Sequence, residues 1–221
     1  MKISVVIGTY NQRETLKLTL ESFFKQSLNP AVYEIVVIDS ESTDKTETMI
    51  EQLKPNCRLN YLRRKNQGKS AARNFGVSQT QGEIILLTDA DMIADPNLLT
   101  EHLKVHSQQA NVAVEGTTYN LKQSLPVNDL RPDHPDVAPY IQQRIKNGQR
   151  LKWSYFLSGN LSLKRATFLA ANGFDENFSQ YGWEDIELGF RLSKMKVPLT
   201  YCAKAINYHY HHKPLSYNNS N

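Results

Sequence analysis

Short apolar runs alternate with amphipathic helical patterns through the first half of the chain. Buried strands are predicted at residues 3–7, 34–38, 59–62 and 83–88. Helices are predicted after the first strand, up to residue 53, over residues 70–77, and from Asp95-Pro96, because proline suits a first helical position. Strands that alternate with helices at this spacing predict an α/β fold, with a mostly parallel sheet and helices on both faces.

Two of these helix starts have the pattern of an N-cap residue with an acidic partner three residues later. Asn11 precedes Glu14, and Asp44 precedes Glu47. The side chain of an N-cap residue accepts a hydrogen bond from the first turn of its helix. We therefore expect Asn11 and Asp44 to cap the first two helices.

The second half of the chain is less regular. A strand is predicted at 112–119, followed by a long loop with a short helix at 123–153, where prolines interrupt the pattern. Helices are predicted at 164–172, before Gly173, and at 184–196, before Pro198. A last strand at 199–208 runs into a cluster of histidines.

Composition is that of an ordinary globular protein. The chain has 221 residues, of which 40% are hydrophobic and 22% charged, and this length buries one sizeable core. No run approaches the ~20 apolar residues that cross a bilayer, and no signal peptide is recognisable. Cys57 and Cys202 are far apart and form no C-x-x-C pair, as in a reducing compartment. A cytoplasmic protein is therefore expected.

Positive charge is concentrated in one segment. The net charge is +4, but residues 54–73 contain seven lysines and arginines and no acidic residue. So small a net charge does not indicate nucleic acid. A local basic segment suits a diphosphate or an anionic membrane surface. Peripheral association with the inner face of the membrane is therefore a second expectation.

Two aspartates stand close together at the end of the fourth predicted strand. Asp89 and Asp91 are two residues apart, and such side chains point the same way from a strand. Like charges this close favour a bound cation, and carboxylate oxygens suit magnesium or manganese, which bind diphosphates. A solvated acidic turn is the alternative. Parallel sheets bind ligands at the carboxyl ends of their strands, which is where this pair lies.

Other polar residues end the first two strands at the same edge. Asp39 could accept a hydrogen bond from the N–H of a base such as uracil, or it could cap the turn into the next helix. Thr9 and Asn11 have the same two interpretations, since a helix cap explains Asn11 equally well.

The start of the predicted helix at 184 and the histidines after the last strand are further candidates. Acidic residues in the triplet Trp183-Glu184-Asp185 suit either the helix dipole or a general base, and the indole ring could stack on a sugar. The histidines, at positions 209, 211 and 212, could supply a metal ligand or form a surface cluster.

The order of these motifs resembles glycosyltransferase family 2, which has the GT-A fold. The resemblance rests on six motifs, at 4–11, 34–44, 66–76, 89–91, 158–160 and 173–187. The last two resemble the acceptor lobe of galactosyltransferase-like enzymes. By this resemblance the chain is a single domain over 1–221, with a nucleotide-sugar half at about 1–110, an acceptor half at about 111–212 and a disordered tail at 213–221.

The resemblance also implies a role for each matching residue. Thr9, Asn11 and Asp39 would hold the nucleoside, with Asp39 on uracil, while Arg73 and Asp89 would lie near the nucleotide. The metal would be bound by Asp91 and His209, with His211 or His212 as alternatives to the histidine. Asp185 would be the base that activates the acceptor. The acceptor would be contacted by Trp183, Glu184, Gly159 and Asn160.

The implied function is an inverting, metal-dependent and non-processive sugar transfer. The donor is expected to be a UDP-sugar, with a GDP-sugar second, alongside Mn²⁺ or Mg²⁺, and the acceptor a saccharide or lipid-linked hydroxyl in cell-surface polysaccharide or glycoconjugate synthesis. Ser40 and Glu41 depart from the family pattern beside Asp39, which bears on base specificity. An inactive nucleotide-sugar-binding homologue is the alternative. A nucleotidyltransferase would need a glycine-rich loop after the first strand, and residues 8–11 hold a single glycine.

Overall fold

The computed structural model describes residues 1–121, 130–134, 137–139, 145–178 and 182–210. The strands are β1 (Ile3–Thr9), β2 (Tyr33–Asp39), β3 (Arg58–Arg63), β4 (Ile84–Asp89), β5 (Met92–Ala94), β6 (Ala113–Leu121), β7 (Val137–Pro139), β8 (Arg150–Leu151), β9 (Asn160–Lys164) and β10 (Leu199–His209). The helices are α1 (Arg13–Phe23), α2 (Thr46–Gln52), α3 (Lys69–Ser78), α4 (Leu98–Gln108), α5 (Arg165–Ala170) and α6 (Glu184–Lys194), with single 3₁₀ turns, η1 and η3, at Pro30–Val32 and Trp153–Tyr155.

All of these strands belong to one sheet, which confirms the predicted α/β class. The strand order is β3-β2-β1-β4-β9-β6-β10-β5, with β7 paired to β6 and β8 to β10. The first four strands are parallel, as their nearly continuous apolar sequences predict. Parallel pairing places the carboxyl ends of β1, β2 and β4 at one edge, where Thr9 is paired with Asp39 and Gly8 with Asp89.

The second half of the chain extends the same sheet in mixed directions. β9 runs antiparallel between β4 and β6, and β10 runs parallel to β6. β5 pairs with β10 alone, antiparallel, with His209 opposite Met92. The pattern did not predict β9 or β5, because each is short and follows a glycine or acidic turn without a long apolar run.

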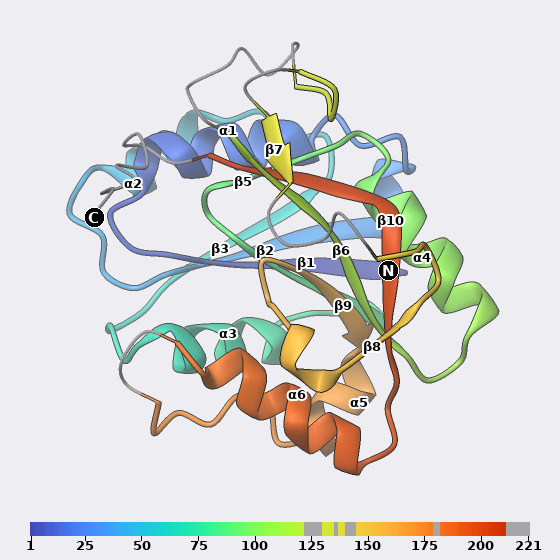
Figure 1. Ribbon diagram of the computed structural model, residues 1–221. Coiled ribbons are helices and arrows are strands. Elements are labelled where there is room, and N and C mark those ends of the chain that lie inside the picture. The colour runs from blue at the N-terminus through green and yellow to red at the C-terminus, as the bar shows by residue number, and fades with distance from the viewer. Residues whose placement is uncertain (122–129, 135–136, 140–144, 179–181, 211–221) are drawn as a thin grey trace, which may run out of the picture.

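Helices cover both faces of the sheet, as predicted (Figure 1). On one face α1, α2 and α4 bury side chains such as Leu20, Met49 and Leu99 against β1, β2 and β4. On the other face α3, α5 and α6 bury Val77, Phe168 and Leu188. At about 25 cal/mol per Å² of buried apolar surface, these two cores provide the main stabilisation of the sheet.

Two helix starts differ from the predicted caps. Gln12, not Asn11, occupies the N-cap of α1, and Asn11 has a left-handed backbone, with φ of 52°. Asp44 instead accepts a hydrogen bond from the Arg13 N–H of α1 at 2.9 Å, so it caps the neighbouring helix. It also accepts from the first N–H of α2, although the N-cap position itself is Lys45.

Other boundaries shift by a few residues. α4 begins at Leu98, two residues after Pro96, because Asp95 closes a turn by accepting from the Asn97 N–H at 2.8 Å. Much of the predicted loop at 123–153 and the predicted tail at 213–221 lie outside the described residues. None of the helices described is long and apolar enough to cross a membrane.

Candidate active site

A cavity of about 370 Å³ opens where β1, β4 and β10 end beside the start of α3. Its wall comes from five segments of the sequence and is formed by Gly8, Thr9, Tyr10, Gln12, Ser40, Asn66, Gly68, Lys69, Ala72, Asp89, Ala90, Asp91 and His209. Four of the predicted site residues therefore meet in one place, namely Thr9, Asp89, Asp91 and His209. The prediction that the strand ends would converge at this edge agrees with the geometry.

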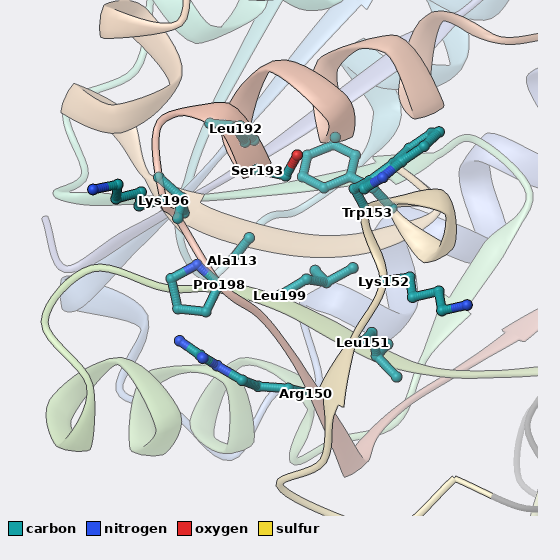
Figure 2. Close-up of a pocket in the computed structure, with 13 residues that line it drawn as sticks. Ala113, Arg150, Leu151, Lys152, Trp153, Leu192, Ser193, Lys196, Pro198 and Leu199 are labelled. Atoms are coloured by element: carbon teal, nitrogen blue, oxygen red, sulfur yellow. The ribbon is translucent and has the colours of Figure 1, made fainter.

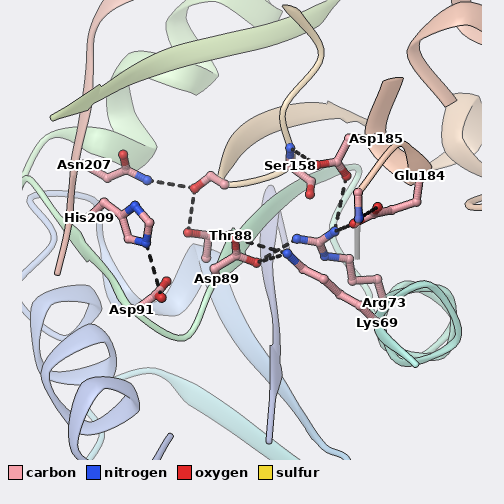
Figure 3. A network of polar contacts seen from close by, with 12 residues as sticks. Lys69, Arg73, Thr88, Asp89, Asp91, Ser158, Glu184, Asp185, Asn207 and His209 are labelled. Atoms are coloured by element: carbon pink, nitrogen blue, oxygen red, sulfur yellow. Dashed lines mark hydrogen bonds and ion pairs between the residues drawn. The ribbon is translucent and has the colours of Figure 1, made fainter. Parts of the chain in front are cut away.

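Asp91 and His209 face each other across this cavity. The Oδ2 of Asp91 lies 3.3 Å from Nε2 of His209, and Figure 3 marks this contact with a dashed line. The Tyr210 N–H donates to the Asp91 carbonyl at 2.8 Å, so β10 fixes the position of the acidic residue. The other carboxylate oxygen of Asp91, Oδ1, is buried and has no hydrogen-bond partner among the described residues. A buried carboxylate oxygen needs a donor or a cation.

An oxygen and an imidazole nitrogen are ligands that manganese accepts, so these two residues fit a divalent ion. Across the described ranges, no group of three or more histidine, cysteine, aspartate or glutamate side chains could hold a metal ion. Within the described ranges, Asp91 and His209 are thus the candidate protein ligands. His211 and His212 lie outside the described residues.

Asp89 is held by two cations from α3. Arg73 Nη2 lies 2.7 Å and Lys69 Nζ 3.2 Å from its Oδ1. Burial raises the pKa of Asp89, but the charges and hydrogen bonds of Lys69 and Arg73 outweigh that effect and bring the pKa to about 2. Asp89 is therefore ionised at neutral pH, and it ties α3 to the end of β4.

Arg73 connects Asp89 with the start of α6. Its side chain is 1% exposed, and Nη1 lies 3.3 Å from Asp185 Oδ1 and 3.7 Å from Glu184 Oε1. The guanidinium also lies over the ring of Phe174, 5.4 Å from its centroid. A planar, permanently charged group can bridge several carboxylates in this way, which an ammonium group cannot do as well.

The first turn of α6 presents the predicted acceptor residues. Asp185 accepts from the Ser158 N–H at 3.3 Å, and the neighbouring Leu157 N–H donates to the buried Glu115, also at 3.3 Å. Burial raises the pKa of Glu115 well above its usual range, whereas Asp185 is paired with Arg73. Trp183 is 72% exposed and has a left-handed φ of 75°, a backbone state that costs energy for a bulky residue.

Gly159 lies close to Asp89, whereas the side chain of Asn160 is buried inside the protein. Gly159 lies beside the acidic pair, since a Cβ on it would come within 3.8 Å of Asp89 Oδ2 and 3.0 Å of Met92. Its carbonyl accepts from Thr88 Oγ1 and Asn207 Nδ2. The Asn160 side chain is 1% exposed.

Asn160 is fully engaged inside the protein. It donates to the carbonyls of Thr117 and Ala205 and pairs with His102 Nε2 at 2.9 Å. This side chain does not line the cavity. Its contact with an acceptor stays a prediction, and the burial of the side chain argues against it.

Asp39 and Asn11 also lie off the cavity wall. Asp39 has no exposed surface, and its carboxylate accepts from the Ser42 N–H at 2.9 Å and from the Tyr61 hydroxyl. It therefore closes the turn after β2, one of its two predicted roles, while its contact with uracil stays a prediction. Asn11 accepts from the Thr43 N–H at 2.7 Å and so joins the loops after β1 and β2.

Sequence reasoning missed several residues of the site. Lys69 was part of a basic segment but was not singled out, and the signal for it is its place at the start of α3, directly after Gly68 with φ of 91°. Asn207 and Thr88 had no recognisable signal. Their partner is the backbone carbonyl of Gly159, in the turn before β9 and more than forty residues away from each of them in sequence.

The chain belongs to glycosyl transferase family 2. The family model matches residues 4–169, and a second model, for the N-terminal domain of galactosyltransferase, matches residues 142–213. The two matches meet in the acceptor-side segment, as the resemblance of the motifs implied.

Curated relatives carry related names. A validoxylamine A glucosyltransferase from Streptomyces hygroscopicus subsp. limoneus is 30% identical, over 90% of this chain and 49% of that protein. The uncharacterized glycosyltransferase YfnE of Bacillus subtilis is 25% identical over 96% of this chain and 65% of its own length, and a chondroitin synthase of Escherichia coli is 26% identical over 94% and 34%. The chain thus spans about half the length of the first of these relatives and less than two thirds of the others.

Solved structures support the GT-A fold. S. aureus TarS 1–349 in complex with UDP-GlcNAc matches with a TM-score of 0.78 and 18% identity, over 96% of this chain and 59% of that one. The mannosyltransferase PcManGT from Pyrobaculum calidifontis, in complex with GDP-Man and Mn²⁺, matches with a TM-score of 0.71 and 19% identity, over 99% and 58%. At these identities the likeness concerns the fold.

Proposed function

We propose that this chain is an inverting, metal-dependent glycosyltransferase that moves a sugar from a nucleotide-sugar to a hydroxyl group of a saccharide or lipid-linked acceptor. The observation that carries the proposal is the facing pair Asp91 and His209 on the cavity wall, with Asp91 Oδ1 buried and unpartnered. The family membership and the Mn²⁺ and nucleotide-sugar named with similar folds support it.

Asp91 and His209 would hold the divalent ion, and the diphosphate of the donor would complete its ligands. When bound, the ion stabilises the negative charge that the leaving diphosphate gains. Asp89, kept ionised by Lys69 and Arg73, adds a fixed negative charge beside the pair. Manganese or magnesium fits this chemistry, since both accept carboxylate oxygens.

The donor would lie along the cavity between β1 and α3. Backbone N–H groups at the start of a helix and a nearby lysine favour phosphate, and Gly68 and Lys69 supply both on the cavity wall. Thr9 offers a buried hydroxyl without a partner. We favour uridine as the base. Guanosine stays the alternative because Ser40, rather than the expected uracil ligand Asp39, lines the cavity wall.

Asp185 would act as the base. It takes the proton from the acceptor hydroxyl as that oxygen bonds to the anomeric carbon, while the bond from this carbon to the diphosphate oxygen breaks. A single displacement from the opposite face inverts the anomeric configuration. Arg73 and the Ser158 N–H orient the carboxylate, and the exposed indole of Trp183 offers a face on which a sugar ring can stack.

We further propose a non-processive enzyme of polysaccharide or glycoconjugate synthesis that works on the cytoplasmic side of the membrane. The polymer synthases among the relatives support the pathway class.

Donor hydrolysis tests the proposal directly. UDP- and GDP-sugars are incubated with the protein, with and without Mn²⁺, and release of the nucleoside diphosphate is measured. We expect release from one nucleotide class, dependent on the metal and abolished by D91N. Metal-independent binding of nucleotide-sugars without hydrolysis or transfer would instead identify an inactive homologue.

A further inference from the structure

A second cavity, of about 360 Å³, lies far from the proposed donor site. It is formed by the start of β10, the short strand β8, the 3₁₀ turn after it and the second half of α6 (Figure 2). β10 begins at Leu199 in this cavity and ends at His209 in the other. A strand of that length spans roughly 30 Å, so the two cavities lie at opposite ends of it.

The floor of this cavity is apolar and its rim is basic. Leu151, Phe156 and Leu199 supply part of the floor. In Figure 2 the cations Arg150, Lys152 and Lys196 surround the apolar side chains. None of the described residues that line it is acidic, and these three cations form no ion pair with the described part of the chain.

Exposed hydrophobic side chains continue the apolar surface beyond the rim. Trp153, Phe190 and Met195 are 41%, 43% and 42% exposed. The rings of Trp153 and Phe190 pack edge to face, 5.3 Å apart, and Lys194 lies over Phe190 at 5.1 Å. Aromatic rings and lysines with apolar stems are the residues that reside at a membrane interface, each with one apolar and one wet end.

We propose that this basic and aromatic face docks on an anionic phospholipid membrane, with lipid phosphates on Arg150, Lys152 and Lys196 and apolar lipid atoms in the cavity. A second copy of the chain fits less well, because a two-fold contact would bring the same cations against one another. A nucleic acid would satisfy the charges but leave the apolar floor and the exposed rings uncovered. Anionic lipid satisfies both.

The proposal does not depend on the sugar-transfer chemistry. Neither Asp91, His209 nor Arg73 lines this cavity. Membrane binding can therefore be measured without donor or metal, and its failure would leave the proposed activity untouched.

Vesicle flotation tests the proposal. The protein is mixed with vesicles of phosphatidylcholine alone or of phosphatidylcholine with phosphatidylglycerol, and the bound fraction is measured. We expect binding to the anionic vesicles only, with salt weakening it. At about 1 kcal/mol for each cation near the surface, R150Q/K152Q/K196Q should lower the partition coefficient on the order of 100-fold.

A matched variant tests whether the position of the cations matters for membrane binding, or only the net charge of the protein. K17Q/K25Q/K45Q removes the same number of exposed cations elsewhere and should float as the wild type does, while W153A should bind several-fold more weakly at an unchanged melting temperature. Equal loss in both triple variants, full binding by R150Q/K152Q/K196Q, or a dimer that dissociates in that variant would overturn the proposal.

Discussion

Arg73 Nη2 lies 2.7 Å from Asp89 Oδ1, and this ion pair joins the two halves of the proposed site. The opposite side of the same guanidinium reaches Asp185, 112 residues later in the chain. The donor side and the acceptor base are therefore held by one buried cation, and their relative positions depend on it.

Replacing Arg73 should damage both stability and catalysis. R73M removes a buried charge between carboxylates, and breaking such a pair costs about 3 kcal/mol or more. Asp89 loses the partner that holds its pKa near 2. The stability from this depressed pKa is present above the unfolded pKa of about 3.9 and is lost as pH falls toward 2.

Chemical denaturation at several pH values measures this effect. In R73M the stability at neutral pH should be lower, but the further loss between about pH 5 and pH 2 should be smaller than in the wild type, because the pKa of Asp89 in the folded protein is less depressed. R73K, which keeps the charge but cannot bridge the carboxylates, should recover much of the stability and little of the transfer rate. Equal rates for R73K and the wild type would contradict the positioning role.

Asp185 should control the transfer step rather than donor binding. D185N removes the proton acceptor, and general base catalysis contributes about 100-fold or more. We expect kcat for transfer to fall by that factor while nucleotide affinity, measured by calorimetry, changes little.

E115Q is the matched control for this test. Glu115 is a neighbouring buried carboxyl whose pKa is raised well above its usual range by burial, and glutamine keeps its shape, so E115Q should transfer at nearly the wild-type rate. A full transfer rate in D185N would show that another group takes the proton.

Asp91 and His209 should decide whether nucleotide binding depends on the metal. In a thermal shift assay, nucleoside diphosphate and Mn²⁺ together should stabilise the wild type, by about 2.7 kcal/mol when the ligand is at 100 times its Kd. D91N and H209Q should lose the increment that Mn²⁺ adds. D133N, which alters an exposed carboxylate paired with Arg131, should keep it, and a wild-type response in D91N would rule out this metal site.

Two buried histidines, His102 and His106, should lower the free energy of unfolding at acidic pH. His102 pairs with Asn160 and Ser162, and His106 pairs with Ser162 at 2.8 Å. Burial lowers the pKa of His102 to about 4 and, with repulsion from His102 and Lys164, that of His106 to about 3. Stability is full above the unfolded pKa of about 6.5 and falls as pH drops, because the unfolded chain binds the protons.

Unfolding measured from pH 7 to pH 4 checks this effect. His102 alone should contribute on the order of 3 kcal/mol of loss across that range. H106Q should reduce the slope, whereas H134Q, outside the cluster, serves as the control. A slope unchanged in H106Q would show that the loss comes from other groups.

The sequence was informative wherever a long regular element ends on a polar residue. The apolar runs of β1, β2 and β4 made the carboxyl edge recognisable, and with it Thr9, Asp89 and Asp91. It was uninformative where a contact joins distant segments. The five residues of β9 do not reveal that this strand separates β4 from β6. Nothing in the local sequence reveals that the Tyr61 hydroxyl donates a hydrogen bond to Asp39.

Arg73 illustrates the same limit. Its place in a basic segment indicated a ligand phosphate, whereas the structure shows it buried among three carboxylates. Charge counted along the chain cannot distinguish a solvated cation from one that neutralises acidic groups brought together by folding.

The pairing of β5 with β10 alone has a consequence for synthesis of the protein. Asp91 is made 118 residues before His209, which at 5–20 residues per second is about 6 to 24 seconds earlier on the ribosome. Until β10 has emerged, β5 lacks the strand with which it pairs in the described part of the chain, and Asp91 lacks its contacts with Tyr210 and His209. We therefore expect the nascent chain to lack the proposed metal site until its last strand is made, and cleavage at the end of β10 to abolish that site in the finished protein.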